Sequence, residues 1–241
     1  MRGGLCLPRA ATPMRKLILW DIDGTLVYTV VAGAAMRAAM GRVFGPVHEQ
    51  ERHAYAGKTD QQIILETFAE RHRDDLLGDL EHFTAVYLEE LEQRRAAILD
   101  LGRVLDGVRP ALERLAVADV VQSVLTGNLK PVARFKLDLM GLTSCFDLES
   151  GAYGSDHAHR VELVPIAAAR AALRYGHQFK GQEIVVIGDT PNDIACGKAA
   201  GARTVAVASG PFSLDQLRAH QPDAALPSLA DTDATLRAIL G

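Results

Sequence analysis

The nine residues LILWDIDGT, at positions 17–25, decide the fold. Four apolar residues, 17–20, are followed directly by two carboxylates, a glycine and a threonine. A short apolar run that ends in turn residues is typical of a strand buried on both faces of a parallel sheet. Asp21 and Asp23 therefore lie on the turn that leaves a buried strand, where two carboxylates can converge on one site. Gly24 permits the tight turn that this requires.

The same pattern recurs along the chain, with a polar cluster after an apolar run. VVQSVL at 120–125 ends in TGN, and EIVVI at 183–187 ends in GDTPND. Shorter runs at 204–207 and 224–226 complete the expected strands, and helical spacing occurs between the runs at 110–115, 131–140, 164–173 and 193–200. Strands that alternate with helices predict an α/β fold with a Rossmann-like parallel sheet. The polar clusters then meet at the edge of the sheet where the strands end.

One long stretch interrupts this alternation. Residues 31–101 contain no convincing strand and are rich in Ala, Glu, Arg, Gln and Leu, which are good helix formers. Helical spacing covers 30–43, 60–73 and 80–99. We therefore predict an all-helical cap, residues 30–102, inserted into an α/β core formed by 14–29 and 103–241. Residues 1–13 are expected to be a disordered leader.

The composition argues against several classes of function. The net charge is −4, whereas a nucleic-acid-binding protein usually has a basic surplus that contacts phosphates, so no nucleic-acid partner is expected. Cys6, Cys145 and Cys196 lie far apart, without zinc-type spacing or a disulfide framework, which favours a reducing cytoplasm. Since no apolar run approaches the roughly 20 residues that span a bilayer, no membrane partner is expected either.

Asp21 and Asp23 are of the residue type that phosphoryl transfer needs. One carboxylate can attack phosphorus, and the other can protonate the leaving oxygen and later activate water. An acidic turn or a calcium loop is the alternative interpretation. A calcium loop of the EF-hand type needs a third oxygen ligand before its glycine and a helix on each side, and this segment has neither.

The other strand ends supply complementary groups. Asp189 can join Asp21 in binding Mg2+, which prefers hard oxygen ligands, and Asp193 can orient a metal-bound water from outside the ligand shell. The hydroxyl of Thr126 and a backbone N–H beside Gly127 can cradle a phosphoryl group. Taken singly, each of these segments could also be a plain strand-to-helix turn.

Together, these motifs resemble those of the haloacid dehalogenase (HAD) superfamily of phosphatases, in the branch with a helical C1-type cap inserted after the first motif. The resemblance covers about residues 16–240 and is greatest to the phosphoglycolate phosphatase-like group. It implies a HAD fold and Mg2+ as the cofactor. The resemblance implies that Asp21 is the nucleophile and a metal ligand, and that Asp23 is the acid/base and binds Mg2+ through its carbonyl. It also implies that Asp189 binds Mg2+ and that Thr126 binds the phosphoryl group. Asp193 takes the second acidic position of the family.

A cation is expected to balance the negative charge of the carboxylates and the phosphate. The family normally has a lysine followed closely by prolines at the start of a helix. Here Arg160 occupies that place, five residues before Pro165, and its planar guanidinium differs in geometry from a point charge. Lys130 and Lys136, on the helix predicted after the middle strand, are the alternatives.

Lys58 is the candidate for substrate binding from the cap. It lies in the tetrapeptide GKTD, 57–60, which resembles the cap segment that contacts substrate in this group. The alternative is that the tetrapeptide is simply a helix start, with Thr59 or Asp60 as the N-cap.

The sequence thus predicts a Mg2+-dependent phosphatase that acts on a small phosphate monoester through an aspartyl-phosphate, with phosphoglycolate as the first expectation. Two further interpretations share the same core motifs: a sugar phosphomutase of the β-phosphoglucomutase kind, and a non-enzymatic binding protein on the same fold. A dehalogenase would need neither Mg2+ nor the second carboxylate of the first motif, and the presence of Asp23, Asp189 and Asp193 argues against it.

Overall fold

A five-stranded parallel sheet forms the centre of the protein. The computed structural model describes residues 16–29, 31–47 and 55–241. The strands lie in the order β4-β1-β5-β6-β7 and every neighbouring pair is parallel. Their bounds are β1 Lys16–Trp20, β4 Val120–Val124, β5 Ile184–Gly188, β6 Arg203–Val207 and β7 Ala224–Leu226. The five predicted strands are therefore all present.

The strand register brings the polar motifs to one level. Trp20, the last residue of β1, pairs with Val124 of β4 and with Ile187 of β5. The residues that follow these three positions therefore leave the sheet side by side. This places the segments after β1, β4 and β5 at one edge, as parallel strands require.

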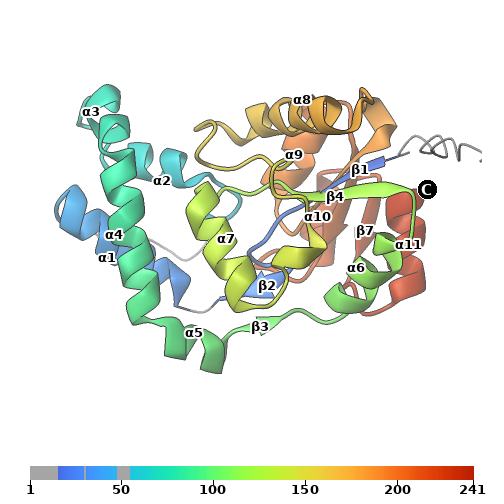
Figure 1. Cartoon of the computed structure of the whole chain (residues 1–241), viewed down its shortest axis with the longest axis horizontal. Helices are drawn as coiled ribbons and strands as arrows, with labels where there is room; N and C mark the ends of the chain where they lie inside the picture. Colours follow the sequence, from blue (N-terminus) through green and yellow to red (C-terminus); the bar gives the residue numbers. More distant parts are fainter. Residues whose placement is uncertain (1–15, 30, 48–54) are drawn as a thin grey trace, which may run out of the picture.

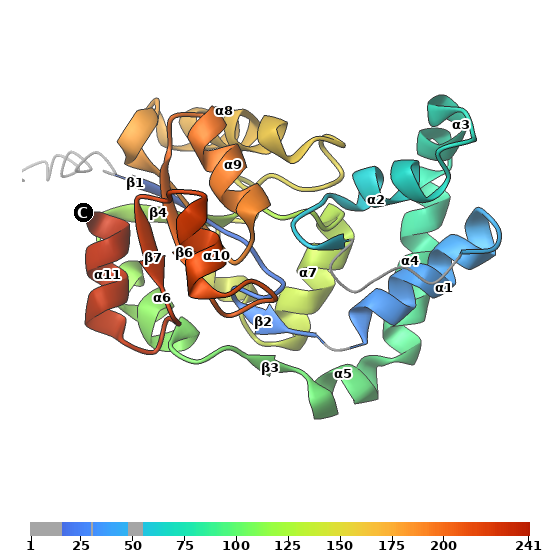
Figure 2. The same cartoon turned by 180° about the vertical axis from the view of Figure 1, so that it is seen from behind.

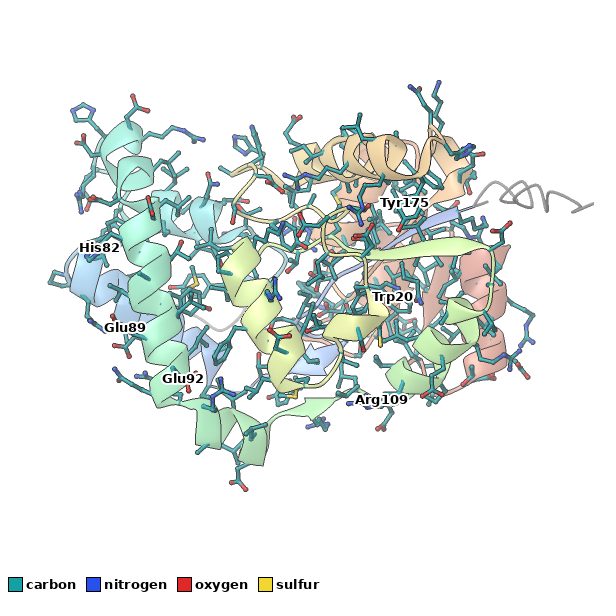
Figure 3. All side chains as sticks on the ribbon, viewed as in Figure 1. Trp20, His82, Glu89, Glu92, Arg109 and Tyr175 are labelled. Carbon is teal, nitrogen blue, oxygen red and sulfur yellow. The ribbon has the colours of Figure 1, made fainter. Side chains whose placement is uncertain are left out.

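Helices cover both faces of the sheet (Figures 1 and 2). Ile18 and Trp20, the latter labelled in Figure 3, contribute to a large buried cluster on one face, whereas Leu17 and Leu19 pack on the other, because successive strand residues point to opposite sides. The first face packs against α6 (Val108–Ala116), α7 (Lys130–Leu139) and α11 (Thr232–Leu240), and the second against α8 (Leu163–Tyr175), α9 (Pro191–Ala199) and α10 (Leu214–Ala219). Burial on both faces explains why β1 reads as an unbroken apolar run.

The part of the chain between β1 and α6 forms a helical lobe beside the sheet (Figure 1). Its helices are α1 Ala32–Val43, α2 Asp60–Thr67, α3 Arg73–Gly78, α4 Leu80–Gln93 and α5 Arg95–Leu101. The chain enters this lobe through β2 (Val27–Tyr28) and leaves it through β3 (Arg103–Val104), and these two strands pair antiparallel. The two connections between lobe and sheet are thus joined into one ribbon.

Some boundaries differ from the predicted ones. The helix predicted over 60–73 ends at Thr67, and α3 begins only at Arg73. The helix predicted over 80–99 breaks at Arg94, whose N–H bonds to the carbonyl of Leu91 in a tight turn. β2 and β3 were not predicted, since two residues are too few to show an alternating pattern.

The division into a cap at 30–102 and a core at 14–29 and 103–241 stays a prediction. The leader predicted at 1–13 lies outside the described residues. Within the described part of the chain, no helix is both long and apolar enough to cross a membrane.

Candidate active site

Asp21 lies at the end of β1, where the register places it. Its N–H donates to the carbonyl of Ile187, 2.9 Å away, which continues the β1–β5 pairing by one residue. Gly24 then adopts a left-handed φ of +86°, a conformation that favours glycine. A Cβ at Gly24 would also overlap the carboxylate of Asp189, so this turn and that carboxylate are fitted to each other.

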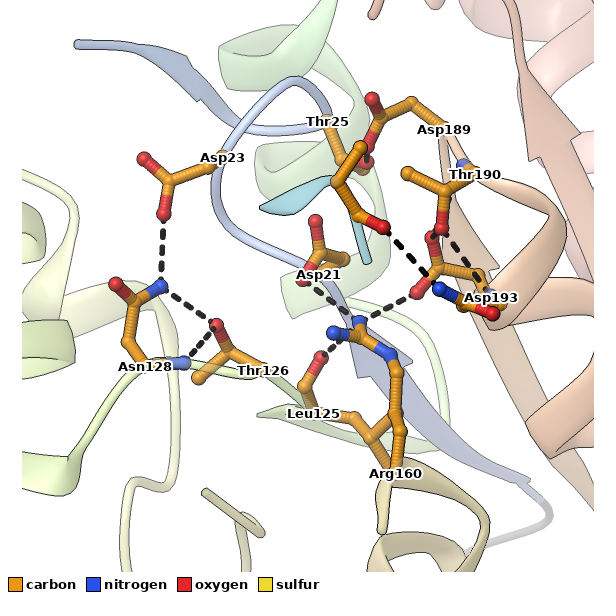
Figure 4. Close-up of polar contacts among 12 residues, drawn as sticks. Asp21, Asp23, Thr25, Leu125, Thr126, Asn128, Arg160, Asp189, Thr190 and Asp193 are labelled. Atoms are coloured by element: carbon orange, nitrogen blue, oxygen red, sulfur yellow. Dashed lines mark hydrogen bonds and ion pairs between the residues drawn. The ribbon is translucent and has the colours of Figure 1, made fainter. Parts of the chain in front are cut away.

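Three carboxylates converge beside this turn (Figure 4). Asp21, Asp189 and Asp193 each have an oxygen within 4.8 Å of the others, and all three side chains are buried. The Arg160 Nη2 donates to Asp21 at 2.8 Å and also to Asp193. One buried guanidinium therefore bridges two of three buried carboxylates.

The cluster has more negative charge than its own cation offsets. Burial raises the pKa of Asp21 to about 7, although the charge of Arg160 opposes this rise. Burial also raises the pKa of Asp189 well above its usual range, and the negative charges of Asp21 and Asp193 add to the effect. A second cation would relieve this repulsion.

The donor set fits Mg2+. The groups that face one another are carboxylate oxygens, the hard ligands that Mg2+ prefers, and Mg2+ usually takes only one or two of them from the protein. The carboxylate of Asp189 fits there because Gly24 and Gly210 have no side chain, since a Cβ at either position would overlap it. Asp21 and Asp189 are therefore suited to hold a divalent cation.

Asp193 has a second set of partners that fixes its orientation. Its Oδ2 accepts from both the N–H (3.0 Å) and the hydroxyl (2.6 Å) of Thr190, in the capping box that starts α9. Its Oδ1 is left to accept from Arg160. Asp193 therefore orients the guanidinium that contacts Asp21, while its predicted role toward a metal-bound water stays a prediction.

Asp23 points away from this cluster, toward the segment after β4 (Figure 4). Its Oδ2 accepts from Lys136 Nζ at 2.6 Å and from Asn128 Nδ2 at 2.7 Å, and its Oδ1 accepts from the Thr29 hydroxyl at 2.8 Å. Burial opposes ionisation of Asp23, but Lys136 and the two other donors outweigh that effect and hold its pKa below the usual value. Asp23 is therefore ionised in this arrangement.

The segment after β4 brings its hydroxyl to the same edge. Thr126 is almost fully buried, and its N–H donates to the carbonyl of Ala152 at 3.1 Å. Its Oγ accepts from Asn128 Nδ2 at 2.8 Å, so Asn128 links Thr126 to Asp23. Thr126 is thus linked to Asp23 of the first motif through Asn128, and its segment leaves the sheet at the same edge, as the strand-end argument predicts.

The three basic candidates have different partners. Arg160 contacts Asp21, Lys136 contacts Asp23, and Lys130 forms an exposed ion pair with Glu149. The sequence analysis looked for a single balancing cation, whereas the structure has two: Arg160 pairs with Asp21, and Lys136 pairs with Asp23. The Lys136 contact depends on which face of α7 meets the site, and the spacing of basic residues does not reveal that.

Sequence reasoning also missed Asn128 and Thr29. Asn128 stands in the quoted motif TGN, and its position beside the predicted phosphoryl-binding residues was the available signal. Lys58, predicted to bind substrate, pairs with Glu66 at 2.6 Å, and its substrate role stays a prediction. The backbone of Lys58 lies against the segment after β4, with its carbonyl where a Cβ of Gly127 would be.

Comparison with known proteins agrees with this geometry. The sequence profile of the haloacid dehalogenase-like hydrolases matches residues 15–201. A phosphoglycolate phosphatase of Vibrio parahaemolyticus is 26% identical over 225 residues, which cover 90% of this chain and 93% of that protein. An N-acetylmuramic acid 6-phosphate phosphatase of Pseudomonas aeruginosa is 27% identical over 209 residues, which cover 85% of this chain and 87% of that protein.

The fold has solved counterparts as well. The crystal structure of a hydrolase from Pseudomonas syringae superposes with a TM-score of 0.69 at 19% identity, covering 93% of this chain and 99% of that one. Both the predicted fold class and the predicted resemblance to phosphoglycolate phosphatase-like proteins are confirmed. The chain belongs to the haloacid dehalogenase-like hydrolase family.

Proposed function

We propose that this protein is a Mg2+-dependent phosphatase that hydrolyses a small phosphate monoester through a phosphoryl group carried on Asp21. The observation that carries the proposal is the pairing of Asp21 with a buried guanidinium at the end of β1. The hydrogen bond from Arg160 fixes the orientation of the Asp21 carboxylate, and it also places a positive charge beside the position where the phosphate charge would develop.

The chain is a phosphatase acting on phosphoric monoesters, as its family and its phosphatase relatives indicate. The arrangement of two carboxylates on one turn supports the same reaction class. Asp21 is buried and paired with Arg160, whereas the Asp23 side chain is 39% exposed. The two carboxylates therefore differ in environment, as a nucleophile and an acid/base do.

The first step forms one bond and breaks one. A carboxylate oxygen of Asp21 attacks phosphorus, the bond from phosphorus to the ester oxygen breaks, and a proton from Asp23 neutralises the departing alkoxide. The hydroxyl of Thr126, the N–H of Gly127 and the guanidinium of Arg160 stabilise charge on the other phosphoryl oxygens. This step needs a proton on Asp23, which is the proton that Asp23 takes from water in the second step of the preceding turnover.

The second step returns the enzyme to its starting state. Asp23 takes a proton from a water molecule, which attacks phosphorus and displaces the Asp21 carboxylate as inorganic phosphate forms. The contact with Lys136 favours ionised Asp23, which is the form that this step needs. Lys136 thus acts on the residue whose protonation state alternates between the two steps.

The metal would be held by Asp21, Asp189 and the main-chain carbonyl of Asp23. When bound, Mg2+ supplies positive charge that offsets the carboxylates and the phosphate and polarises a phosphoryl oxygen. The raised pKa values of Asp21 and Asp189 support a site that is short of one cation.

Phosphoglycolate is the first candidate substrate, and the name of the Vibrio relative supports it. The name of the Pseudomonas relative makes a sugar-acid phosphate the second. Both are phosphate monoesters of small carboxylic acids. We therefore expect a panel of such esters to contain the preferred substrate.

Release of inorganic phosphate from that panel, with Mg2+ and with chelator, tests the proposal. We expect Mg2+-dependent release with a clear preference, and loss of turnover by at least about a thousandfold in Asp21→Asn, since the nucleophile is removed. Asp223→Asn is the matched control, because Asp223 bonds to Thr204 just before β7, at the opposite edge of the sheet. Full activity of Asp21→Asn would exclude Asp21 as the nucleophile, and no release by the folded wild type would exclude the phosphatase proposal.

A further inference from the structure

The helical lobe touches the segment after β4 through one carboxylate. Asp60, the first residue of α2, donates its N–H to the carbonyl of Gly127 at 2.7 Å. Its Oδ2 accepts the N–H of Leu129 at 2.9 Å. The backbone groups on both sides of Asn128 are thus bonded to a single residue of the lobe.

The second of these bonds helps to cap helix α7. Helix α7 begins after Leu129, an apolar residue whose side chain cannot cap it, and no side-chain cap comes from within the helix. A carboxylate that accepts an N–H at a helix start stabilises that helix and suits its positive end. Asp60 of the lobe therefore caps α7 together with Ser155, whose Oγ accepts the N–H of Lys130 at 2.8 Å, and α7 carries Lys136, the partner of Asp23.

The segment after β4 has no spare room at this contact. A Cβ on Gly127 would overlap the carbonyl of Lys58, and a Cβ on Gly154 would overlap the carbonyl of Gly127. The Thr59 hydroxyl donates to the carbonyl of Ala158, and Gln61 Nε2 donates to that of Ser155 at 3.0 Å. Residues 126–129 are therefore enclosed between the start of α2 and the 154–158 loop, in the region where the lobe and the sheet meet in Figures 1 and 2.

The contacts within the sheet domain hold this segment less completely. Thr126 N–H bonds to Ala152, and the carbonyl of Asn128 accepts from the N–H of Gly154. Among the described contacts, the carbonyl of Gly127 and the N–H of Leu129 are bonded only by Asp60. The orientation of the peptide groups next to Thr126 and Asn128 thus depends on the lobe being docked.

We infer that Asp60 is a positioning residue, which shapes the phosphoryl-binding segment 126–129 and the start of α7 from the helical lobe. The segment then takes its binding shape only while the lobe is docked, so docking and phosphate binding favour each other. This inference rests on the proposed function, in which Thr126 and Gly127 bind the phosphoryl group. Asp60 itself need not touch the substrate.

The burial of Asp60 agrees with a role of this kind. It is 5% exposed, and burial raises its pKa to about 6, opposed by the charge of Lys136 and the N–H of Leu129, while the charge of Asp23 adds to the rise. Tyr87 of α4 is the other titratable group near it. A carboxylate kept in such a place is costly to the folded state, which is typical of a functional position.

The test compares variants that remove or keep the acceptor. Asp60→Ala removes it, Asp60→Leu removes it while keeping the branched shape of the side chain, and Asp60→Asn keeps an oxygen that can accept from Leu129. Gln61→Ala is the matched control, since it removes a neighbouring bond from the lobe to Ser155 and leaves residues 126–129 untouched. Each variant is assayed for kcat and KM on two esters with different leaving groups, for inhibition by inorganic phosphate, and for melting temperature.

We expect Asp60→Ala and Asp60→Leu to lower kcat and to weaken inhibition by phosphate, each by about tenfold or more and equally for both esters. Asp60→Asn and Gln61→Ala should stay within about threefold of the wild type. If Asp60→Ala does not fold, Asp60→Leu decides the question.

Three results would overturn the inference. Unchanged phosphate inhibition in the folded Asp60→Leu protein would show that Asp60 does not shape the phosphate site. A loss confined to one ester would mean that Asp60 contacts the leaving group, and a loss in Asp60→Asn as large as in Asp60→Leu would mean that charge matters and the acceptor does not. Failure of the proposed function is distinguishable, because the wild type would then release no phosphate, and binding of inorganic phosphate measured by calorimetry would still report the effect of Asp60.

Discussion

Replacement of Arg160 by methionine should destabilise the protein in a pH-dependent way. Arg160 is the one described cation that contacts the cluster of Asp21, Asp189 and Asp193, and all four side chains are buried. Removing one partner of a buried ion pair typically costs about 3–5 kcal/mol, because the remaining charge is left without compensation. We expect a loss in this range at about pH 7.5, where the carboxylates are ionised in the unfolded chain.

The loss should shrink in acid. The folded-state pKa of Asp21 is about 7 even with Arg160 present, above its ordinary value of 3.8, so between these two values the folded state binds more protons than the unfolded state. Removal of the guanidinium raises the folded-state pKa further, and protonation then relieves the repulsion as the pH falls. Each pKa unit corresponds to about 1.4 kcal/mol, and pH 7.5 lies about half a unit above the Asp21 pKa of about 7, so we expect the loss to be up to about 1 kcal/mol smaller at pH 5.5 than at pH 7.5.

Urea denaturation at the two pH values measures both quantities. Arg134→Met is the control, because Arg134 pairs with Asp138 in an exposed ion pair, which should be worth about 1 kcal/mol or less at either pH. A loss below about 1 kcal/mol in Arg160→Met at pH 7.5, or an equal loss at both pH values, would contradict the view that the guanidinium offsets buried carboxylates. Arg160→Met should also reduce turnover by at least about a hundredfold, as removal of a charge-stabilising group does.

Three further predictions follow from the same region. Mg2+ should raise the melting temperature more at about pH 8 than at about pH 6, because protons compete with the metal for Asp21 and Asp189, whose pKa values are raised. Thermal denaturation with a chelator control measures the two shifts, and equal shifts would contradict this. Asp60→Asn should stabilise the protein at neutral pH by on the order of 3 kcal/mol in urea denaturation, because burial raises the pKa of Asp60 to about 6. This gain in stability should disappear as the pH falls from about 6 to 4, since the wild-type folded state binds the extra proton in that window. A variant less stable than the wild type at neutral pH would refute it. Gly210→Ala should lower activity by about tenfold or more, because the added methyl group would overlap the Asp189 carboxylate. Gly41→Ala, in open space on α1, is the control and should leave activity unchanged. Wild-type activity in Gly210→Ala would show that Asp189 is free to move.

The sequence predicted the site best where a strand direction determined position. Asp21, Thr126 and Asp189 are far apart in the chain, yet each follows an apolar strand, and the ends of parallel strands share an edge. Knowing that they lie together required only the strand pattern. Arg160 was found by its place before a helix, although the sequence did not reveal that Asp193 orients it.

Contacts that depend on helix packing could not be predicted in this way. Lys136 reaches Asp23 because one face of α7 is turned toward the site, and that rotation is set by tertiary packing. From the sequence, Asp60 was a candidate cap of its own helix or part of a substrate-contacting segment, whereas its carboxylate accepts an N–H at the start of α7 across the interface between lobe and sheet. Such a contact joins residues 69 positions apart, and no local pattern records it.

The most direct test of the account is to trap the phosphoryl group on the protein. Asp23→Asn should react with p-nitrophenyl phosphate, whose leaving group needs no proton, but should release phosphate slowly because the base is missing. Rapid acid quench, borohydride reduction of the acyl phosphate and peptide mass spectrometry then locate the modified residue. We expect modification at Asp21, with none in an Asp21→Asn/Asp23→Asn double variant. A phosphoryl group on any other residue, or continued turnover by the double variant, would contradict it.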